Sequence, residues 1–378
     1  MFPPLPDFRL EVYLGEWEFA ARHHLTASDA QTVTIAELLA LGSDEQRKAF
    51  QNLALSYTPT WGGDDLLKAI AGTYERVEPE HVLAFAGAEE AMFWVLRELL
   101  GPADHAIVTV PNYQSMESVT LATGADTQAL PLREHDGWSI DLDALERMLR
   151  PNTRLVAVNF PNNPTGALPE EATFRRLVEL CDAHGIRLLS DEVFRGLELD
   201  PRDTLPQAAD LSPSAVSMGV MSKSYGLPGL RIGWLACRDR ALLERLERRK
   251  HYTSICNSAP SEHLATIALQ NGERIRRRNR EIIADNLPLF DDFFSRWLDR
   301  FDWEHPQGGC VCFPRLTTGE PTSSFCRRLV REAGVVLLPA DVFASQLAEV
   351  PADRFRIGVG RLDCVAALDA FDGFLRVT

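Results

Sequence analysis

The sequence lacks several features that mark special classes of protein. No apolar run reaches the ~18 residues that a membrane-spanning helix needs. The first residues, MFPPLPDFRLEVYLGEWEF, lack the basic, apolar and small-residue order of a signal peptide. The seven cysteines are scattered without a CxxC pair, which indicates neither a disulfide framework nor a zinc site. We therefore expect a cytoplasmic protein that binds no metal and no membrane.

Positive charge is also in short supply. The chain has 39 lysines and arginines against 54 acidic residues, and its formal net charge of −15 repels the phosphate backbone of nucleic acids. One basic run, RIRRRNR at residues 274–280, is interpreted as the solvent-exposed face of a helix. The glycine fingerprint GxGxxG of dinucleotide-binding proteins is missing after the first predicted strand. We expect neither a nucleic acid nor a dinucleotide as a partner.

Lysine is the scarcest charged residue. Lys48, Lys68 and Lys250 stand in the segments EQRK, DDLLKAIAGTY and ERRK, which are typical of surface lysines. The fourth, Lys223, lies among small and apolar residues in MSKSYGLPGLRIGW. A lysine in a largely apolar setting has a lowered pKa, and its amine can condense with an aldehyde to form a Schiff base. Lys223 is therefore the candidate covalent catalyst.

The order of apolar segments predicts an α/β protein. From about residue 80, short apolar runs alternate with longer amphipathic ones, which is typical of a mainly parallel sheet with helices on both sides. After about residue 285 the pattern changes to that of a smaller α+β domain. We expect residues 1–40 to form an N-terminal arm that joins the small domain, residues 41–284 the large domain, and residues 285–378 the small domain.

Several candidate site residues directly follow predicted strands, where open α/β sheets bind their ligands. They are Gly87, Tyr113, Asn163, Asp191 and Lys223.

These positions suit an aldehyde cofactor that has a ring nitrogen and a phosphate. The turn GAEEA opens a helix after a strand, so the free N–H groups of Ala88 and Glu89 can hold a phosphate. Arg231 follows the turn-forming residues Gly226, Pro228 and Gly229 and can point at the same phosphate. Asp191 can keep a ring nitrogen protonated.

Together the motifs resemble those of the fold type I pyridoxal-phosphate enzymes, class I/II aminotransferases with the architecture of aspartate aminotransferase. The resemblance extends from about Tyr57 to Arg356 and implies pyridoxal 5'-phosphate as the cofactor. In SKSYGLPGLRIGW it implies a Schiff base at Lys223 and phosphate contacts from Ser222 and Arg231. The Gly87, Ala88 and Glu89 turn would complete the phosphate site, Asn163 in NFPNNPTG would bind O3' of the cofactor, and Asp191 in SDEVF would bind the pyridine nitrogen.

The resemblance also assigns residues around the ring and the substrate. Tyr113 in VPNY would stack on the cofactor. Arg356 in FRIGVG would grip the substrate α-carboxylate through two hydrogen bonds, near Asn163. Tyr57 would reach the phosphate in the partner subunit of a homodimer. In EVYLGEWEF, either Glu16 or Trp17 contacts substrate or the segment is an amphipathic docking helix.

Two residues depart from the family pattern. Phe194 stands where the family usually has a tyrosine whose hydroxyl contacts O3', and its presence is expected to raise the pKa of the Schiff base. Val220 stands where a serine usually contacts the phosphate, which removes one hydrogen bond.

The resemblance implies an aminotransferase that exchanges the amino group between an amino acid and a 2-oxo acid, with active sites at the interface of a homodimer. A first alternative is another reaction on the same cofactor, such as β-elimination, decarboxylation or a cyclisation like that of capreomycidine synthase, because the fold does not select the reaction. A second alternative is a non-catalytic regulator that binds the cofactor. Such regulators join this fold to a DNA-binding module, and no helix-turn-helix pattern precedes Tyr57.

Overall fold

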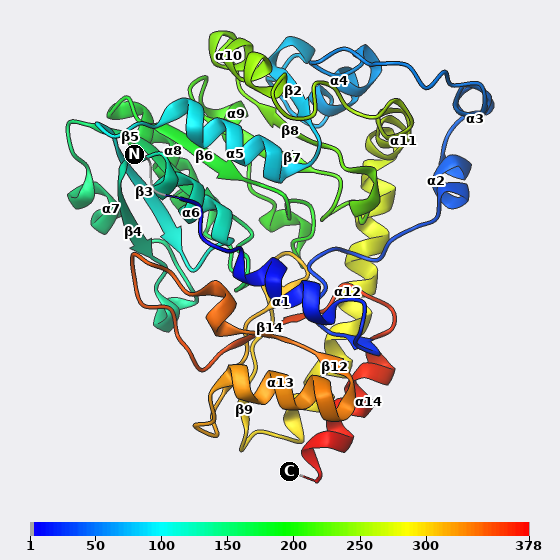
Figure 1. Cartoon of the computed structure of the whole chain (residues 1–378), viewed down its shortest axis with the longest axis vertical. Coiled ribbons are helices and arrows are strands. Elements are labelled where there is room, and N and C mark those ends of the chain that lie inside the picture. Colours follow the sequence, from blue (N-terminus) through cyan, green and yellow to red (C-terminus); the bar gives the residue numbers. More distant parts are fainter. Residues whose placement is uncertain (1–3, 378) are drawn as a thin grey trace.

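The protein is built around a seven-stranded sheet (Figure 1). The structure is a computed structural model that describes residues 4–377. Residues 1–3 of the predicted arm and residue 378 of the predicted small domain lie outside the described residues. The strand order is β2-β8-β7-β6-β5-β3-β4, and β8 is antiparallel to both of its neighbours, while the other pairs are parallel. The strands are β2 (Val82–Phe85), β3 (His105–Val110), β4 (Asp126–Pro131), β5 (Thr153–Asn159), β6 (Arg187–Asp191), β7 (Val216–Val220) and β8 (Gly233–Ala236).

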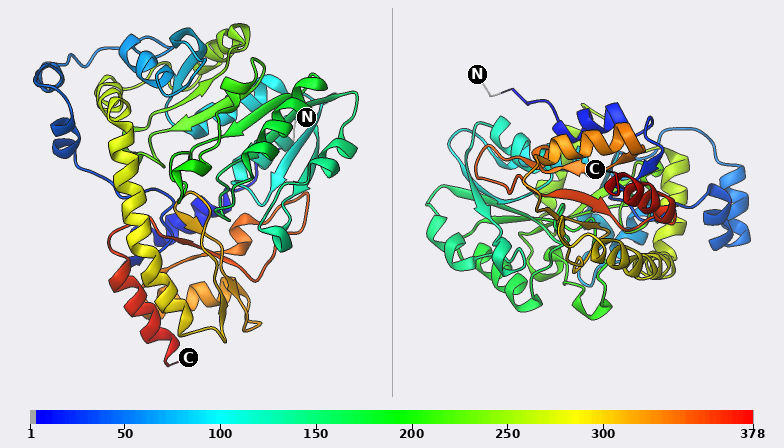
Figure 2. Two further views of the ribbon diagram at one scale, coloured as in Figure 1. Left: turned by 180° about the vertical axis from the view of Figure 1, so that it is seen from behind. Right: turned by 90° about the horizontal axis from the view of Figure 1, so that it is seen from below.

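This sheet confirms the predicted mainly parallel α/β fold. The strand β8 was not predicted from the sequence, because its apolar run IGWLAC directly continues the lysine segment. Helices cover both faces of the sheet (Figures 1 and 2). They include α5 (Ala88–Leu99), α6 (Gln114–Ala122), α7 (Leu142–Met148), α8 (Glu171–Ala183), α9 (Ala208–Leu211) and α10 (Arg240–Lys250).

Alternation along the strands divides the core between the two faces. In β3, Ala106 and Val108 pack in the cluster that contains α5 and α10, whereas Ile107 packs in the cluster that contains α7 and α8. Successive side chains of a strand point to opposite faces, so a strand buried on both sides is apolar throughout. Because β3 to β7 run parallel to one another, their carboxyl ends lie at the same edge of the sheet.

The C-terminal part forms a second body. It has a three-stranded antiparallel sheet of order β10-β14-β13 and three long helices. Its elements are α12 (Gly272–Ser295), β9 (Phe301–Asp302), β10 (Val311–Cys312), β11 (Arg315–Leu316), α13 (Thr322–Ala333), β12 (Val335–Val336), β13 (Leu338–Pro339), β14 (Phe355–Gly358) and α14 (Cys364–Leu375). The boundary predicted between residues 284 and 285 falls inside the single helix α12, and the division into domains stays a prediction.

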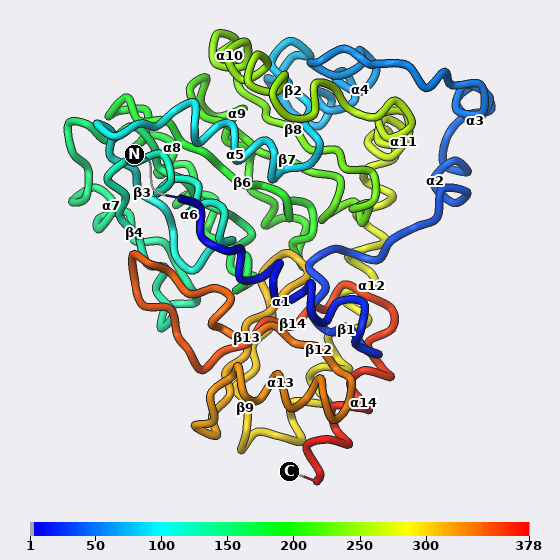
Figure 3. Tube along the Cα trace, viewed as in Figure 1, coloured from blue at the N-terminus to red at the C-terminus, as the bar shows by residue number. Residues whose placement is uncertain are grey.

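The N-terminal segment lies against this second body. The strand β1 (His23–His24) pairs in parallel with β12, and the amide of Gly358 in β14 donates to the carbonyl of Leu25. Figure 3 shows the N-terminal trace passing between the two bodies before it reaches the side of the molecule. The remaining helices are α1 (Arg9–Trp17), α2 (Ile35–Leu41), α3 (Asp44–Gln51), α4 (Asp64–Ala71) and α11 (Ala259–Gln270). Short 3-10 helices are η1 (Pro79–His81), η2 (Glu134–Asp136), η3 (Pro201–Asp203), η4 (Pro228–Leu230) and η5 (Ala340–Phe343).

Two features of the described chain concern its surroundings. Within residues 4–377, no helix combines the length and the apolar character that crossing a membrane requires. The seven cysteines are free, and all but Cys256 are buried.

The basic run at residues 274–280 is only partly exposed. Arg276 donates to the hydroxyl of Tyr225 at 2.8 Å, and Arg280 donates to the carbonyl of Gly196 at 2.9 Å. Arg274 and Arg277 are exposed. The interpretation as a solvent-exposed face was therefore wrong for the side of α12 that packs against the large body.

The prediction that Lys250 lies at the surface was wrong. It is 0% exposed, and its Nζ donates to the carbonyls of Thr60 and Ala84 and to Oδ1 of Asn257 at 2.6–2.7 Å. Burial lowers the pKa of this lysine to about 8. The reason lies in the helix period, because Lys250 is four residues after the buried Leu246 on the same face of α10.

Replacing this buried amine should destabilise the protein. We expect Lys250→Met to lower the free energy of unfolding by about 3 kcal/mol, because three buried acceptors lose their donor. Urea unfolding followed by circular dichroism measures the change. Lys68→Met is the control, since Lys68 is exposed on α4 and its loss should cost less than about 0.5 kcal/mol. Equal stabilities of the two variants would contradict the role given to Lys250.

Candidate active site

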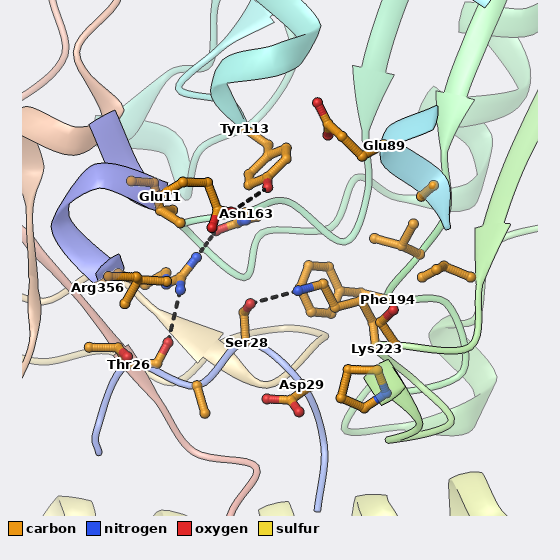
Figure 4. A pocket seen from close by; sticks show the side chains of 18 of the residues that line it. Glu11, Thr26, Ser28, Asp29, Glu89, Tyr113, Asn163, Phe194, Lys223 and Arg356 are labelled. Carbon is orange, nitrogen blue, oxygen red and sulfur yellow. Dashed lines mark hydrogen bonds between the residues drawn. The ribbon is translucent and has the colours of Figure 1, made fainter. Parts of the chain in front are cut away.

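A cavity of about 800 Å³ lies at the edge of the large sheet where the parallel strands end. Residues of β5, β6 and β7 and of the loops that follow them form its floor. The helix α1 and the segment 24–29 line its other side, together with Arg356 of β14. Figure 4 shows side chains from both bodies of the protein pointing into this space. The cavity is therefore assembled from parts that are far apart in the sequence.

Lys223 lies inside this cavity, just beyond the end of β7. Its Nζ donates to the hydroxyl of Ser28 at 2.7 Å and lies 5.8 Å from the ring centroid of Phe194. Burial lowers the pKa of the amine, and the nearby Arg356 lowers it further. A lysine whose pKa is lowered in this way is more often neutral, and only the neutral amine is nucleophilic.

Asp191 is the last residue of β6 and is buried in the cavity floor. One carboxylate oxygen accepts a hydrogen bond from the amide of Val193 at 3.2 Å. Burial raises the pKa of this carboxyl to about 7, against the opposing effects of that bond and of Lys223. A buried carboxylate of this kind is stabilised by a positively charged group that binds next to it.

Arg356 provides a buried cation on the other side of the cavity. It is 2% exposed and makes no salt bridge with any residue of the described chain. Its Nη1 donates to Oδ1 of Asn163 at 3.0 Å and its Nη2 to the carbonyl of Thr26 at 2.8 Å, while Nε has no partner. Burial lowers the pKa of the guanidinium to about 10. This unpaired charge suits an anionic ligand.

The start of α5 and Arg231 form a second anion-binding feature. The helix begins at Ala88 without a side-chain cap, and Ala88, Glu89, Ser222 and Arg231 all line the cavity. Gly87 has φ +104°, and a Cβ atom there would lie 2.5 Å from Nη2 of Arg231. The glycine thus lets the guanidinium lie against the helix start, where free N–H groups favour an anion.

The two departures from the family pattern also lie at the cavity. Phe194 is 1% exposed beside the lysine amine, so no hydroxyl is offered at this position. Val220 lines the cavity at the end of β7.

Tyr113 also lines the cavity, and its hydroxyl donates to Oε1 of Glu11 at 3.1 Å.

Three predicted site residues lie elsewhere. Tyr57 is 87% exposed, in the segment between α3 and α4, and does not line the cavity. Its contact with a partner subunit stays a prediction. Glu16 and Trp17 do not line the cavity either. Of the two alternatives for this segment, the docking helix is the one that the structure shows, with Glu11 and Leu14 of α1 facing the cavity and Trp17 packed against the second core cluster. Contact of Glu16 or Trp17 with substrate stays a prediction.

Several residues that close the cavity were not predicted from the sequence. They are Glu11, Thr26, Ser28, Asp29 and Arg361. The hydrogen bond between Ser28 and Lys223 joins residues 195 positions apart. No local pattern in the segment LTASDAQ could have predicted it. The amphipathic pattern of EVYLGEWEF did indicate docking, but not which face would be turned toward the site.

The chemistry of these side chains fits one kind of cofactor. The buried amine of Lys223 can react with an aldehyde. The buried carboxylate of Asp191 can bind a basic ring nitrogen, and Arg231 at the uncapped start of α5 can bind a phosphate. Fold and site together define a fold type I pyridoxal-phosphate enzyme.

Comparison with known proteins identifies the family. Residues 27–365 match the family described as aminotransferase class I and II, and the chain belongs to it. Its cofactor is pyridoxal 5'-phosphate, as predicted. Capreomycidine synthase of Streptomyces vinaceus is 32% identical over 360 residues, which are 94% of this chain and 89% of that protein. The arginine–pyruvate transaminase AruH of Pseudomonas aeruginosa is 30% identical over 306 residues, 77% of this chain and 76% of the relative.

Solved structures agree with this assignment. A pyridoxal-phosphate-dependent aminotransferase from Streptococcus suis superposes with a TM-score of 0.91 at 29% identity, covering 99% of both chains. Aspartate aminotransferase from Thermotoga maritima superposes with a TM-score of 0.81 at 22% identity over 98% of both chains, which shows the fold alone. The predicted fold is confirmed. The relatives include both aminotransferases and a synthase, so the family does not settle the reaction.

The close approach at Gly87 can be tested through cofactor affinity. We expect Gly87→Ala to weaken the binding of pyridoxal phosphate at least about tenfold, because the new Cβ displaces Arg231 and the residue must keep a positive φ. Titration of the cofactor-free protein, followed by absorbance, measures the dissociation constant. Gly185→Ala is the control, since Gly185 also has a positive φ but open space around it. Unchanged affinity in Gly87→Ala would place the phosphate elsewhere.

The buried neighbour of Asp191 predicts a pH dependence of stability. Oε1 of Glu192 accepts from the amide of Ala208 and the hydroxyl of Ser217, and burial raises the pKa of this carboxyl to about 7. The folded state therefore keeps a proton that the unfolded chain loses near pH 4.5. The free energy of unfolding is higher while Glu192 is protonated, and this contribution is lost as the pH rises through about 7.

We expect the cofactor-free protein to lose roughly 2 kcal/mol more stability between pH 5 and pH 8 than the Glu192→Gln variant. Urea unfolding at several pH values measures both curves. Parallel curves would contradict the raised pKa.

Proposed function

We propose that this protein is an aminotransferase that exchanges the amino group between an amino acid and a 2-oxo acid. The observation that carries the proposal is the meeting of three groups in one cavity: the amine of Lys223, the carboxylate of Asp191 and the unpaired guanidinium of Arg356. The arginine–pyruvate transaminase relative is named for an amino acid and a 2-oxo acid, the same pair of substrate classes.

The proposal gives each cavity residue a binding role. Asp191 holds the protonated ring nitrogen of the cofactor. Arg231, Ser222 and the first amides of α5, at Ala88 and Glu89, hold the phosphate. Asn163 and Tyr113, which line the cavity, would contact the ring. When bound, pyridoxal phosphate supplies an electron-withdrawing ring that stabilises negative charge at the substrate Cα.

Lys223 has two roles in this proposal. Its Nζ would hold the cofactor aldehyde covalently before the substrate binds. The free Nζ would then accept the proton from the substrate Cα as a general base and give it back as a general acid. Arg356 holds the α-carboxylate with its fork of N–H groups and so points the Cα–H bond toward Nζ.

We further propose a homodimer in the cytoplasm. Two-fold pairing is the commonest form of oligomer, and the exposed Tyr57 would then complete the phosphate site of the partner subunit. The seven free cysteines are consistent with a reducing compartment.

A second candidate is a different reaction on the same cofactor, with cyclisation of an amino acid foremost. Similarity to capreomycidine synthase over 94% of the chain favours it. So does Phe194, which offers the lysine an apolar ring where aminotransferases of this family usually offer a hydroxyl. The regulator considered from the sequence has no such support, because both relatives compared above carry enzyme names.

The proposal can be tested by adding single amino acids to the purified enzyme without any 2-oxo acid. An aminotransferase should release one equivalent of the matching 2-oxo acid per subunit and then stop, as mass spectrometry would show. A cyclase should convert the amino acid over many turnovers without that product. Lys223→Ala should lower either rate at least about 1000-fold, whereas Lys68→Ala should not. Full turnover by Lys223→Ala would overturn the role of the lysine.

A further inference from the structure

The walls of the cavity carry more negative charge than the proposed chemistry uses. Six carboxylates line it, namely Glu11, Glu18, Asp29, Glu89, Asp191 and Asp363. The cationic groups on the same walls are Lys223, Arg231, Arg356 and Arg361. An excess of one charge inside a cavity with low-dielectric walls raises the local concentration of ligands of the opposite sign.

Most of the cations already have a partner. Asp29 forms a salt bridge with Arg361 at 2.6 Å. In the proposed function, which this inference extends, Arg231 faces the phosphate, Arg356 the substrate carboxylate, and Asp191 the ring nitrogen. Four carboxylates then remain, and none of them makes a salt bridge within residues 4–377: Glu11, Glu18, Glu89 and Asp363.

The four carboxylates are not equivalent. Glu18 and Asp363 are exposed at the mouth of the cavity, as many acidic residues are in a chain of net charge −15, and they do not carry the inference. Glu11 is exposed as well, but it differs because it lies on the face of α1 turned toward the cavity, where its Oε1 accepts from the hydroxyl of Tyr113 at 3.1 Å. Figure 4 shows it close to Arg356, on the side of Tyr113 away from Glu89.

Glu89 completes the arrangement from the other wall. Its Oε2 accepts from the hydroxyl of Ser115 at 3.0 Å. Burial raises the pKa of this carboxyl to about 7, and the negative charge of Glu11 contributes to the shift. Glu11 and Glu89 carry like charge on opposite sides of Tyr113 (Figure 4), so a cation bound beside either would lower the repulsion between them.

The cavity therefore has two poles. Arg356, which is 98% buried, has an unpartnered Nε that can bind an anion. The carboxylate of Glu11 forms no salt bridge with Arg356 and can bind a cation. We infer that the substrate is an α-amino acid with a positively charged side chain, a guanidinium or an ammonium group, which Glu11 binds with the support of Glu89. A carboxylate next to Arg356 disfavours substrates whose side chain is negative, because that charge would face Glu11.

Paired substrates test the charge without changing the shape. Arginine is compared with citrulline, and lysine with norleucine, because each neutral compound has nearly the length of its cationic counterpart. The readout is exchange of the α-hydrogen in D₂O, followed by mass spectrometry, since both candidate reactions must break this bond. We expect kcat/KM for the preferred cationic amino acid to exceed that of its neutral counterpart at least about 100-fold. A preference for arginine assigns the guanidinium, and one for lysine assigns the ammonium.

Variants on α1 separate recognition from folding. Glu11→Gln should lower kcat/KM for the cationic amino acid about 10- to 100-fold, mainly through KM, and leave the neutral counterpart unchanged. Glu11→Asp should keep part of the preference. Glu16→Gln is the matched control, because Glu16 lies on the same helix but does not line the cavity.

The outcomes distinguish this inference from the proposed function. Equal exchange of neutral and cationic amino acids, or an unchanged preference in Glu11→Gln, would overturn the inference and leave the proposed chemistry at Lys223 intact. Exchange with no amino acid at all would overturn the proposed function itself, and the substrate assignment with it.

Discussion

The site depends on contacts between the loop after β7 and a segment almost 200 residues earlier in the chain. The amide of Ala30 donates to the carbonyl of Lys223 at 3.3 Å, and the hydroxyl of Ser28 accepts from its Nζ at 2.7 Å. The same segment accepts from Arg356 through the carbonyl of Thr26. One extended stretch thus fixes both the amine and the guanidinium relative to each other. Asn163 of the large body adds a second link, since its Oδ1 accepts from Nη1 of Arg356 at 3.0 Å.

Much of the large body could be predicted from the sequence, because strands buried on both faces are continuous apolar runs and their ends carry the polar residues. Asp191, Asn163 and Lys223 do meet at one edge of the sheet. What could not be predicted depends on packing between distant segments. Glu11 reaches the cavity because of how α1 docks, and Lys250 is buried although its neighbours in sequence are charged. Both outcomes depend on helix orientation, which local patterns do not specify.

Positive and negative side chains lie in different parts of the cavity. Cations lie where the cofactor phosphate and the substrate carboxylate are proposed to bind, at Arg231 and Arg356. The unpaired carboxylates lie on α1, on α5 and at the mouth. Separation of the two signs orients a zwitterionic ligand before any covalent step, since a reversed ligand would place like charges together. The N-terminal helix of this chain supplies Glu11 of the second set.

The pairing of the N-terminal segment with the C-terminal body also limits when this part of the protein can fold during synthesis. His23 and His24 pair with Val335 and Val336, and Leu25 accepts from Gly358. These partners leave the ribosome more than 300 residues after the segment itself. The large sheet can form as its strands emerge, but residues 23–25 lack these partners until β12 and β14 have been made. The cavity that holds Lys223 is therefore closed only late in synthesis, once β14, which carries Arg356, has been made.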